Sequence, residues 1–151
     1  ETIRGAPASV AELVRSGRFR WVGGGGHLTA TTHVDNTVEG LWLAATKAPA
    51  GGVYFVTDGE PVVFREFVSR LIETQGVTPP TGSVPTTLAR GGAVLAEAAW
   101  RLLRRPGSPP LTQFSVWVSS LECTLDIGRA ERDLGYRPVK SREDGLAELS
   151  A

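Results

Sequence analysis

The stretch Thr29-Ala-Thr-Thr-His-Val-Asp-Asn-Thr-Val-Glu-Gly-Leu-Trp-Leu-Ala-Ala45 predicts a β-strand that runs directly into an α-helix. Its first half is rich in β-branched residues, which favour extended backbone: Thr29, Thr31, Thr32 and Val34. Apolar residues then recur at helical spacing, at Val34, Val38, Leu41, Trp42 and Ala45. Asp35 lies at the switch, where its carboxylate can accept a hydrogen bond from a free N–H of the first helical turn. We therefore expect a strand, a cap at Asp35 and a helix with one apolar stripe.

A second strand–helix unit follows the first. The run Val53-Tyr-Phe-Val-Thr57 is apolar enough for a strand that is covered on both faces. A turn at Asp58–Pro61 leads into an amphipathic helix that ends near Gly76 and carries apolar residues at Phe64, Phe67, Val68, Leu71 and Ile72. Two such units in tandem predict a parallel sheet and an α/β fold.

The rest of the chain predicts mostly helices. Residues 6–16 form a short amphipathic helix, and 111–121 a further helix, although Val116–Val118 leaves a strand possible there. Other helices begin after Pro85, Asp126 and Ser141. A Pro/Gly-rich linker at 78–83 suggests two parts. We expect residues 1–77 to form the terminal βα units of a nucleotide-binding sheet, and 78–151 to form a C-terminal substrate-binding lobe.

Composition narrows the class of protein. The chain has 151 residues, 41% of them hydrophobic, and its 16 basic and 16 acidic residues cancel, which disfavours binding to nucleic acid. No apolar run approaches the ~20 residues of a membrane-spanning helix. Cys123 is the single cysteine, so a reducing compartment is the default and we expect a cytoplasmic protein. Methionine is absent and the first residue is Glu1, from which we expect a piece of a longer protein.

Several chemical motifs can be excluded by their context. A hydrolase is disfavoured because no Gly-x-Ser-x-Gly sequence is present. The glycines at 23–26 precede strand-like sequence instead of a helix, so they do not predict a phosphate-binding loop. No metal site is expected, because the candidate ligands lack the spacing of one helical turn: His27, His33, Asp35 and Asp58. Tyr136 and Lys140 have the Tyr-x-x-x-Lys spacing, but Pro138 prevents a continuous helix between them.

Three segments, taken together, resemble a known family. Thr31–Ala45 is similar to a strand–helix segment of the extended short-chain dehydrogenases, within the NAD-dependent epimerase/dehydratase superfamily. Its Val-Asp-Asn form is most similar to the branch of 3β-hydroxysteroid and sterol-4-carboxylate dehydrogenases. Tyr54–Pro61 resembles the next βα unit of that branch, and the segments 126–130 and 134–138 resemble its closing motif. The resemblance spans about residues 18–149, in family order.

This resemblance implies the C-terminal portion of a Rossmann-like, NAD- or NADP-dependent oxidoreductase. The family's dinucleotide fingerprint and its catalytic Ser, Tyr and Lys would lie upstream of Glu1. We therefore expect no catalytic residue, no metal and no bound cofactor in this chain alone. The segment Leu28–Thr32 lacks the arginine that nucleotide-sugar epimerases place there, which favours an apolar secondary alcohol or ketone as the substrate. The alternative is a non-catalytic binding or interaction module derived from the same fold.

The sequence also predicts where a substrate would bind. Ligands of open α/β sheets lie beyond the carboxyl ends of the strands, and Thr32 and His33 stand near such an end. We expect Thr32 and His33 as polar substrate contacts and Trp117 as an apolar wall. The alternative for His33 is that it only ties the strand to a neighbouring loop. The expected partner is a small-molecule alcohol or ketone, with a homodimer possible.

Overall fold

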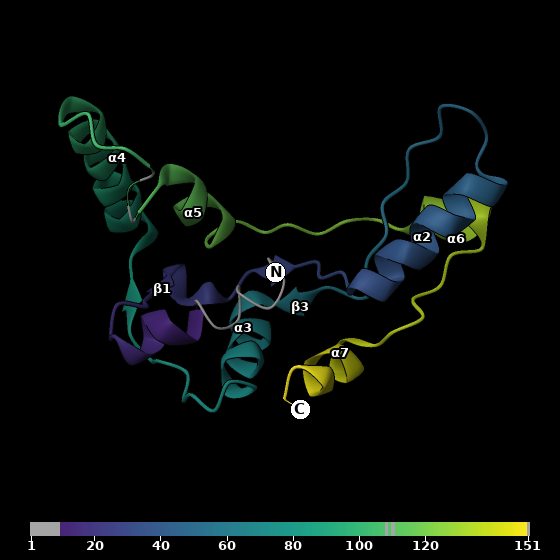
Figure 1. Cartoon of the computed structure of the whole chain (residues 1–151), viewed down its shortest axis with the longest axis horizontal. Coiled ribbons are helices and arrows are strands. Elements are labelled where there is room, and N and C mark those ends of the chain that lie inside the picture. Colours follow the sequence, from purple (N-terminus) through teal and green to yellow (C-terminus); the bar gives the residue numbers. More distant parts are fainter. Residues whose placement is uncertain (1–9, 108, 110, 151) are drawn as a thin grey trace. The chain divides into compact units, whose positions relative to one another are not determined.

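The structure is a computed structural model and describes residues 10–107, 109 and 111–150. Residues 10–15 are helical, and residues 6–9 of the helix predicted there lie outside the described part. The further elements (Figure 1) are β1 (Trp21–Val22), η1 (Gly23–Gly25), β2 (Leu28–Thr29), α2 (Val34–Lys47), β3 (Val62–Val63), α3 (Phe64–Glu73), β4 (Ser83–Val84), α4 (Thr86–Leu102), α5 (Gln113–Val118), α6 (Gly128–Leu134) and α7 (Arg142–Glu148).

The chain divides into two compact units, each assembled from two separate stretches of sequence. The first unit comprises the described parts of Glu1–His27 and Val63–Glu122, and the second comprises Leu28–Val62 and Cys123–Ala151 as far as they are described. These units interleave in sequence, so neither coincides with the stretches 1–77 or 78–151. That predicted division concerns function, and it stays a prediction.

The first unit contains a short parallel strand pair, the helical residues 10–15 and the helices α3, α4 and α5. Strand β1 pairs with β4 in parallel, with Trp21 opposite Ser83 and Val22 opposite Val84. Helix α4 packs on α5, and the shared core consists of buried Ala89, Ala93 and Val116 with Val22, Val84 and Leu111 against them. Thr112 caps α5, because its Oγ1 accepts a hydrogen bond from the N–H of Ser115.

The second unit packs α2 against α6 (Figure 1). Its core consists of Leu43, Ala130, Leu134 and Tyr136, with Tyr54, Val56 and Ile127 among the side chains packed on it. Gly40 lets α2 approach the extended segment 53–57 closely. A Cβ at residue 40 would lie 2.7 Å from Cγ1 of Val56, so a larger residue there would push the helix away.

The buried face of α2 differs from the apolar stripe that the sequence predicts. Asn36, Gly40 and Leu43 are the buried residues of this helix. The predicted stripe is exposed instead, with Trp42 66% exposed and Val38 59% exposed. The reason is that Tyr54, Val56 and α6 contact only the other side of α2. A helix with apolar residues on both sides has no unique inner face until its neighbours are known.

Of the two predicted strands, the first is shorter than expected and the second does not form. Within 29–34 only Thr29 belongs to a strand, and it forms a parallel bridge with Cys123. Residues 53–57 are extended, but no strand of the described chain pairs with them. A strand requires a neighbour for its backbone hydrogen bonds, and sequence periodicity cannot supply one.

The fold class itself is confirmed. The chain is mixed α/β with a parallel strand pair. Helix α4 follows Pro85 as predicted, and α7 begins after Ser141, whose Oγ accepts from the N–H of Asp144. The glycine run forms η1 and leads into β2, in line with the expectation that no helix opens on it.

Candidate functional site

The start of α2 is held by His33. Its backbone is extended, and its Nδ1 accepts a hydrogen bond from the N–H of Asp35 at 3.2 Å. The predicted cap at Asp35 is therefore wrong. The helix begins two residues earlier than that assignment requires, so Asp35 falls in the first turn, where its carboxylate lies 3.7 Å from His33 Nδ1 and 3.8 Å from Lys140 Nζ.

The hydrogen bond at Nδ1 also determines the tautomer of neutral His33. A nitrogen that accepts a hydrogen bond carries no proton, so the proton of the neutral ring lies on Nε2. Nε2 lies 3.5 Å from the carboxylate of Glu148 on α7. The ring also packs against Gly145, where a Cβ would come within 2.8 Å of His33 Cδ2. Both ring nitrogens are thus engaged within the chain.

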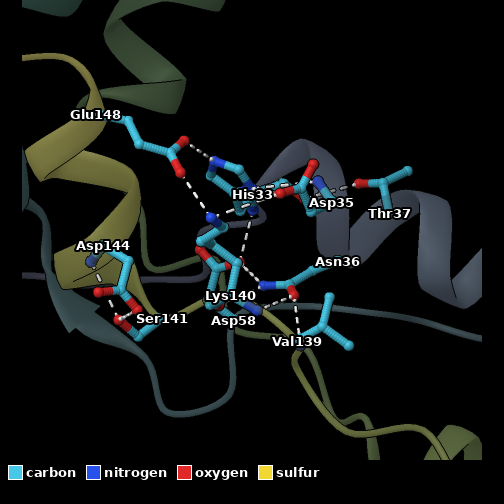
Figure 2. A network of polar contacts seen from close by, with 10 residues as sticks. All are labelled: His33, Asp35, Asn36, Thr37, Asp58, Val139, Lys140, Ser141, Asp144 and Glu148. Carbon is cyan, nitrogen blue, oxygen red and sulfur yellow. Dashed lines mark hydrogen bonds and ion pairs between the residues drawn. The ribbon is translucent and has the colours of Figure 1, made fainter.

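Asp58 joins the two βα units at the same point. Its carboxylate accepts a hydrogen bond from the hydroxyl of Thr31 at 2.8 Å. It also accepts from the backbone N–H of His33 and from the side-chain amide of Asn36 at 2.7 Å (Figure 2). The backbone N–H of Asp58 donates in turn to the carbonyl of Thr31. The turn after residue 57 therefore lies beside residues 31–36.

Asn36 is the most fully satisfied side chain of this region. It is completely buried, and its amide donates to Asp58 and to the carbonyl of Lys140, while its oxygen accepts from the N–H groups of Val139 and Lys140 (Figure 2). The donors and acceptors at 139–140 are more than 100 residues away in sequence. Asn36 therefore locks α2 to the segment that precedes α7.

Lys140 and Glu148 complete this network, which we call the His33 cluster: His33, Asp35, Asn36, Asp58, Lys140 and Glu148. Lys140 Nζ donates to Glu148 at 2.6 Å. This hydrogen bond and the attraction between the two charges raise the pKa of Lys140 and lower the pKa of Glu148 from their ordinary values. Both side chains reach water, so the pair fixes geometry more than it adds stability.

The predicted substrate contacts occupy two different units. Thr32 and His33 lie in the second unit, where Thr32 is exposed and its hydroxyl donates to the carbonyl of Val56 at 3.2 Å. Trp117 lies on α5 in the first unit, 58% exposed, and lines a hollow with Arg90, Val94, Gln113 and Phe114. Contact of these three residues with a substrate stays a prediction.

Tyr136 and Lys140 do not form a catalytic pair. Residues 136–140 are not helical. The buried Tyr136 hydroxyl donates to the carbonyl of Thr57 at 2.8 Å, whereas Lys140 reaches Glu148. Burial, followed by the negative charges of Asp58 and Glu39, raises the pKa of Tyr136 to about 12. A phenol held in this way anchors the core and is a poor proton acceptor at neutral pH.

This raised pKa predicts a loss of stability in alkaline solution. Below pH 10.0, the ordinary pKa of tyrosine, both the folded and the unfolded chain keep the phenol proton; above it the unfolded chain releases the proton first, and the stabilisation is lost as the pH rises through about 12. We expect denaturant midpoints to fall more steeply over this range in the unsubstituted chain than in Tyr136→Phe. Parallel pH profiles would show that Tyr136 titrates normally when folded.

The described residues do not fit a dinucleotide phosphate site. Such a site needs backbone N–H groups at the start of a helix that follows a glycine loop. Here Gly23–Gly25 leads into β2, and α2 and α3 begin with Asp35 and Glu66 in their first turns, whose charges oppose a phosphate. No group of three or more potential metal ligands gathers in the described part of the chain.

Sequence patterns alone did not indicate that Asn36 and Lys140 belong to the His33 cluster. Asn36 lies between Val34 and Val38 of the predicted apolar stripe, and the spacing of Lys140 suggested only a pair with Tyr136. One signal was available, since Asn36, Gly40 and Leu43 share helical spacing. A polar residue in line with a glycine and a leucine indicates a buried amide that needs partners.

Comparisons with known proteins confirm the family resemblance. No family model matches the sequence. The chain is 43% identical over 138 residues to 4-hydroxy-2-methyl-3-oxo-4-farnesyl-3,4-dihydroquinoline-1-oxide ketoreductase of Stigmatella aurantiaca, covering 91% of this chain and 41% of that protein. It is 32% identical over 150 residues to isoform 1 of the 3β-hydroxysteroid dehydrogenase/decarboxylase of Arabidopsis thaliana, covering 91% of this chain and 34% of that protein.

A solved structure shows the same fold. DesIV of Streptomyces venezuelae, a dTDP-glucose 4,6-dehydratase solved with NAD and TYD bound, superposes with a TM-score of 0.60 at 25% identity, covering 96% of this chain and 36% of that one. The chain thus spans about two fifths or less of the proteins it matches, in agreement with the predicted C-terminal portion. Sequence and fold together identify it as similar to part of an extended short-chain dehydrogenase, in the branch that includes the 3β-hydroxysteroid dehydrogenases.

Proposed function

We propose that this chain is the C-terminal, substrate-binding portion of an NAD- or NADP-dependent oxidoreductase that interconverts a secondary alcohol and a ketone on a sterol-like or other apolar substrate. The observation that carries this proposal is the similarity over 91% of the chain to a ketoreductase whose substrate bears a farnesyl group. The similarity to a 3β-hydroxysteroid dehydrogenase points to the same chemistry, an oxygen-bearing ring carbon in an apolar molecule.

The division of labour follows from the residues described above. Neither a phosphate-binding helix start nor a helical Tyr/Lys pair is present in the described part of the chain. The cofactor and the tyrosine that takes the hydroxyl proton would therefore be held by residues outside this chain. The chain itself would bind the substrate, and the His33 cluster would hold the loop ends of its second unit in one geometry.

An apolar substrate is favoured over a nucleotide sugar. Recognition of a diphosphate requires free cationic or N–H donors. The segment 28–32 contains no arginine. Arg142 approaches it from α7, where Nε donates to Thr31 and Nη2 to the carbonyl of Glu60. Two of its N–H donors are thus used within the chain, and the preference rests mainly on the absence of an arginine from the segment 28–32.

Location and assembly are further parts of the proposal. Across the described residues, no helix combines the length and apolar character needed to cross a bilayer. A cytoplasmic location rests on the single cysteine, Cys123, and a homodimer rests on the family resemblance.

The proposal is tested with the longer parent protein. Hydride transfer is followed by nicotinamide absorbance with a 3β-hydroxysteroid and with a long-chain secondary alcohol, and dTDP-glucose serves as the control substrate. We expect NAD- or NADP-dependent turnover of at least one apolar alcohol and none of the nucleotide sugar. A parent that binds no nicotinamide cofactor, or that converts only the nucleotide sugar, contradicts the proposal. If the parent binds no nicotinamide cofactor, the alternative of a non-catalytic binding or interaction module remains.

A second measurement tests the predicted role of His33 in the parent. As a substrate contact, His33→Ala is expected to raise KM for the alcohol more than it changes cofactor affinity. As a helix cap, its loss costs about 1 kcal/mol of stability. His33→Asn separates the two roles, because an asparagine oxygen can still cap α2. If His33→Asn restores both the melting temperature and KM, His33 acts only in the structure.

A further inference from the structure

The first unit contains a hollow of about 590 Å³ that the sequence did not predict. It is lined by residues 18–20 and 22 and by residues of α4 and α5, with Leu13, Val84 and Leu111 at its sides. Its apolar lining includes the buried residues Ala89 and Val116, and the more exposed Phe19, Val22 and Leu88. This volume lies within the range of about 300–1,000 Å³ that small-molecule sites occupy. The hollow can therefore hold a ligand of moderate size.

The charged residues that line this hollow are all positive. Arg18 and Arg20 both line it and are exposed, and no aspartate or glutamate is among its lining residues. Arg20 is oriented by hydrogen bonds from Nη1 to the carbonyls of Gly17 and Phe19. Neither arginine forms an ion pair with an acidic side chain of the described residues. Two unneutralised guanidinium groups beside an apolar surface favour an anion that carries an apolar group.

The two serines that line the hollow are not free to bind a head group through their hydroxyl protons. Ser115 and Ser119 line it too, but their hydroxyls donate to the carbonyls of Thr112 and Ser115, respectively. Specificity for a head group therefore falls to the arginines. The buried floor at Ala89 and Val116 offers no hydrogen-bonding side chain, so it suits an alkyl chain.

We propose that this hollow binds a long-chain carboxylic acid, with the alkyl chain against Ala89 and Val116 and the carboxylate at Arg18 and Arg20. As the substrate class of the parent, which would then be a hydroxy or oxo acid with a long alkyl chain, this inference rests on the proposed function. As a binding site of this chain, it stands on the hollow and its arginines alone.

The apolar part of the proposal is tested with two matched variants of the 151-residue chain. Leu88 and Leu95 lie on α4 and are similarly exposed, at 70% and 72%, but only Leu88 lines the hollow. Dodecanoate is titrated below its micellar concentration by calorimetry. We expect Leu88→Glu to weaken binding about tenfold, a difference of ~1.4 kcal/mol, and Leu95→Glu to bind like the unsubstituted chain. Equal affinity in the two variants, or no binding to the unsubstituted chain, overturns the proposal.

The head group is tested with Arg18→Gln and with an uncharged ligand. Loss of one exposed guanidinium is expected to weaken dodecanoate binding about two- to fivefold, while Arg132→Gln, an exposed arginine on α6 in the second unit, leaves it unchanged. Dodecanol is expected to bind more weakly than dodecanoate and to be insensitive to Arg18→Gln. Equal affinities for the acid and the alcohol overturn the carboxylate assignment and favour a neutral ligand.

These measurements need no cofactor and no catalysis, so they separate the two proposals. Dodecanoate binding that Leu88→Glu weakens and Leu95→Glu does not supports the hollow even if the parent oxidises no alcohol. Conversely, a parent that oxidises apolar alcohols while this chain binds no dodecanoate supports the proposed function and overturns the hollow as its substrate site.

Discussion

Asn36→Ala is expected to lower the free energy of unfolding by about 3 kcal/mol or more. The side chain is completely buried, and its removal deprives the carbonyl of Lys140 and the N–H groups of Val139 and Lys140 of their side-chain partner, and takes one of three hydrogen bonds from the Asp58 carboxylate. A buried group left without a hydrogen bond costs about 1–3 kcal/mol. The measurement is urea unfolding of this chain, followed by circular dichroism.

Thr37→Ala is the matched control for Asn36→Ala. Thr37 is the next residue on α2 and is exposed, and its hydroxyl donates only to the carbonyl of His33, four residues back. We expect a change of less than about 0.5 kcal/mol. If Asn36→Ala also changes the free energy of unfolding by less than about 0.5 kcal/mol, water replaces the amide and the hydrogen bonds of Asn36 do not stabilise the fold. Asn36→Ala should in addition weaken the capping of α2, because Asn36 helps to position Asp58, which holds the backbone N–H of His33.

Trp21→Ala is expected to have a comparable effect in the first unit, about 3–5 kcal/mol. Trp21 is 1% exposed, and its ring meets Phe19 and Phe64 edge-on at centroid distances of 4.9 and 6.3 Å. Its Nε1 donates to the carbonyl of Pro80 at 2.6 Å, which ties β1 to the segment before β4. The substitution therefore removes a large buried side chain and a long-range hydrogen bond. Urea unfolding of the same chain measures the loss.

Trp42→Ala is the control for this second substitution. Trp42 is 66% exposed on α2, so its removal should change stability of this chain by less than about 1 kcal/mol. A large effect of Trp42→Ala would show that the predicted apolar stripe is buried in solution. Because Trp21 and Asn36 belong to different units, their effects are expected to add when both are substituted.

The hydrogen bonds of Asn36 also help to position His33, the predicted substrate contact. His33 is held through its backbone by Asp58, through Nδ1 by the start of α2 and through Nε2 by Glu148. Substitution of Asn36 should therefore disturb His33 without touching it. If the parent protein is the proposed oxidoreductase, a rise in KM with Asn36→Ala that His33→Asn does not reproduce would identify the position of residues 31–33, and not the imidazole, as the feature that substrate binding needs.

The sequence by itself determined the properties that depend on neighbours along the chain. Apolar spacing predicted α3, Pro85 predicted the start of α4, and Ser141 predicted the start of α7. The order of the strand–helix segments predicted the α/β class and the family resemblance, which the comparisons confirm. These features are local because backbone conformation, helical period and caps involve residues within about four positions of each other.

Only the tertiary structure decided the features that depend on distant residues. It chose Asn36, Gly40 and Leu43 as the inner face of α2, made His33 the cap, and left 53–57 without a strand partner among the described residues. It also brought Lys140 and Glu148 to His33, and Arg18 and Arg20 to the hollow. The physical reason is that burial and hydrogen bonding depend on which surfaces meet. A helix with two apolar sides, or a strand with two open edges, is compatible with more than one neighbour until the chain has folded.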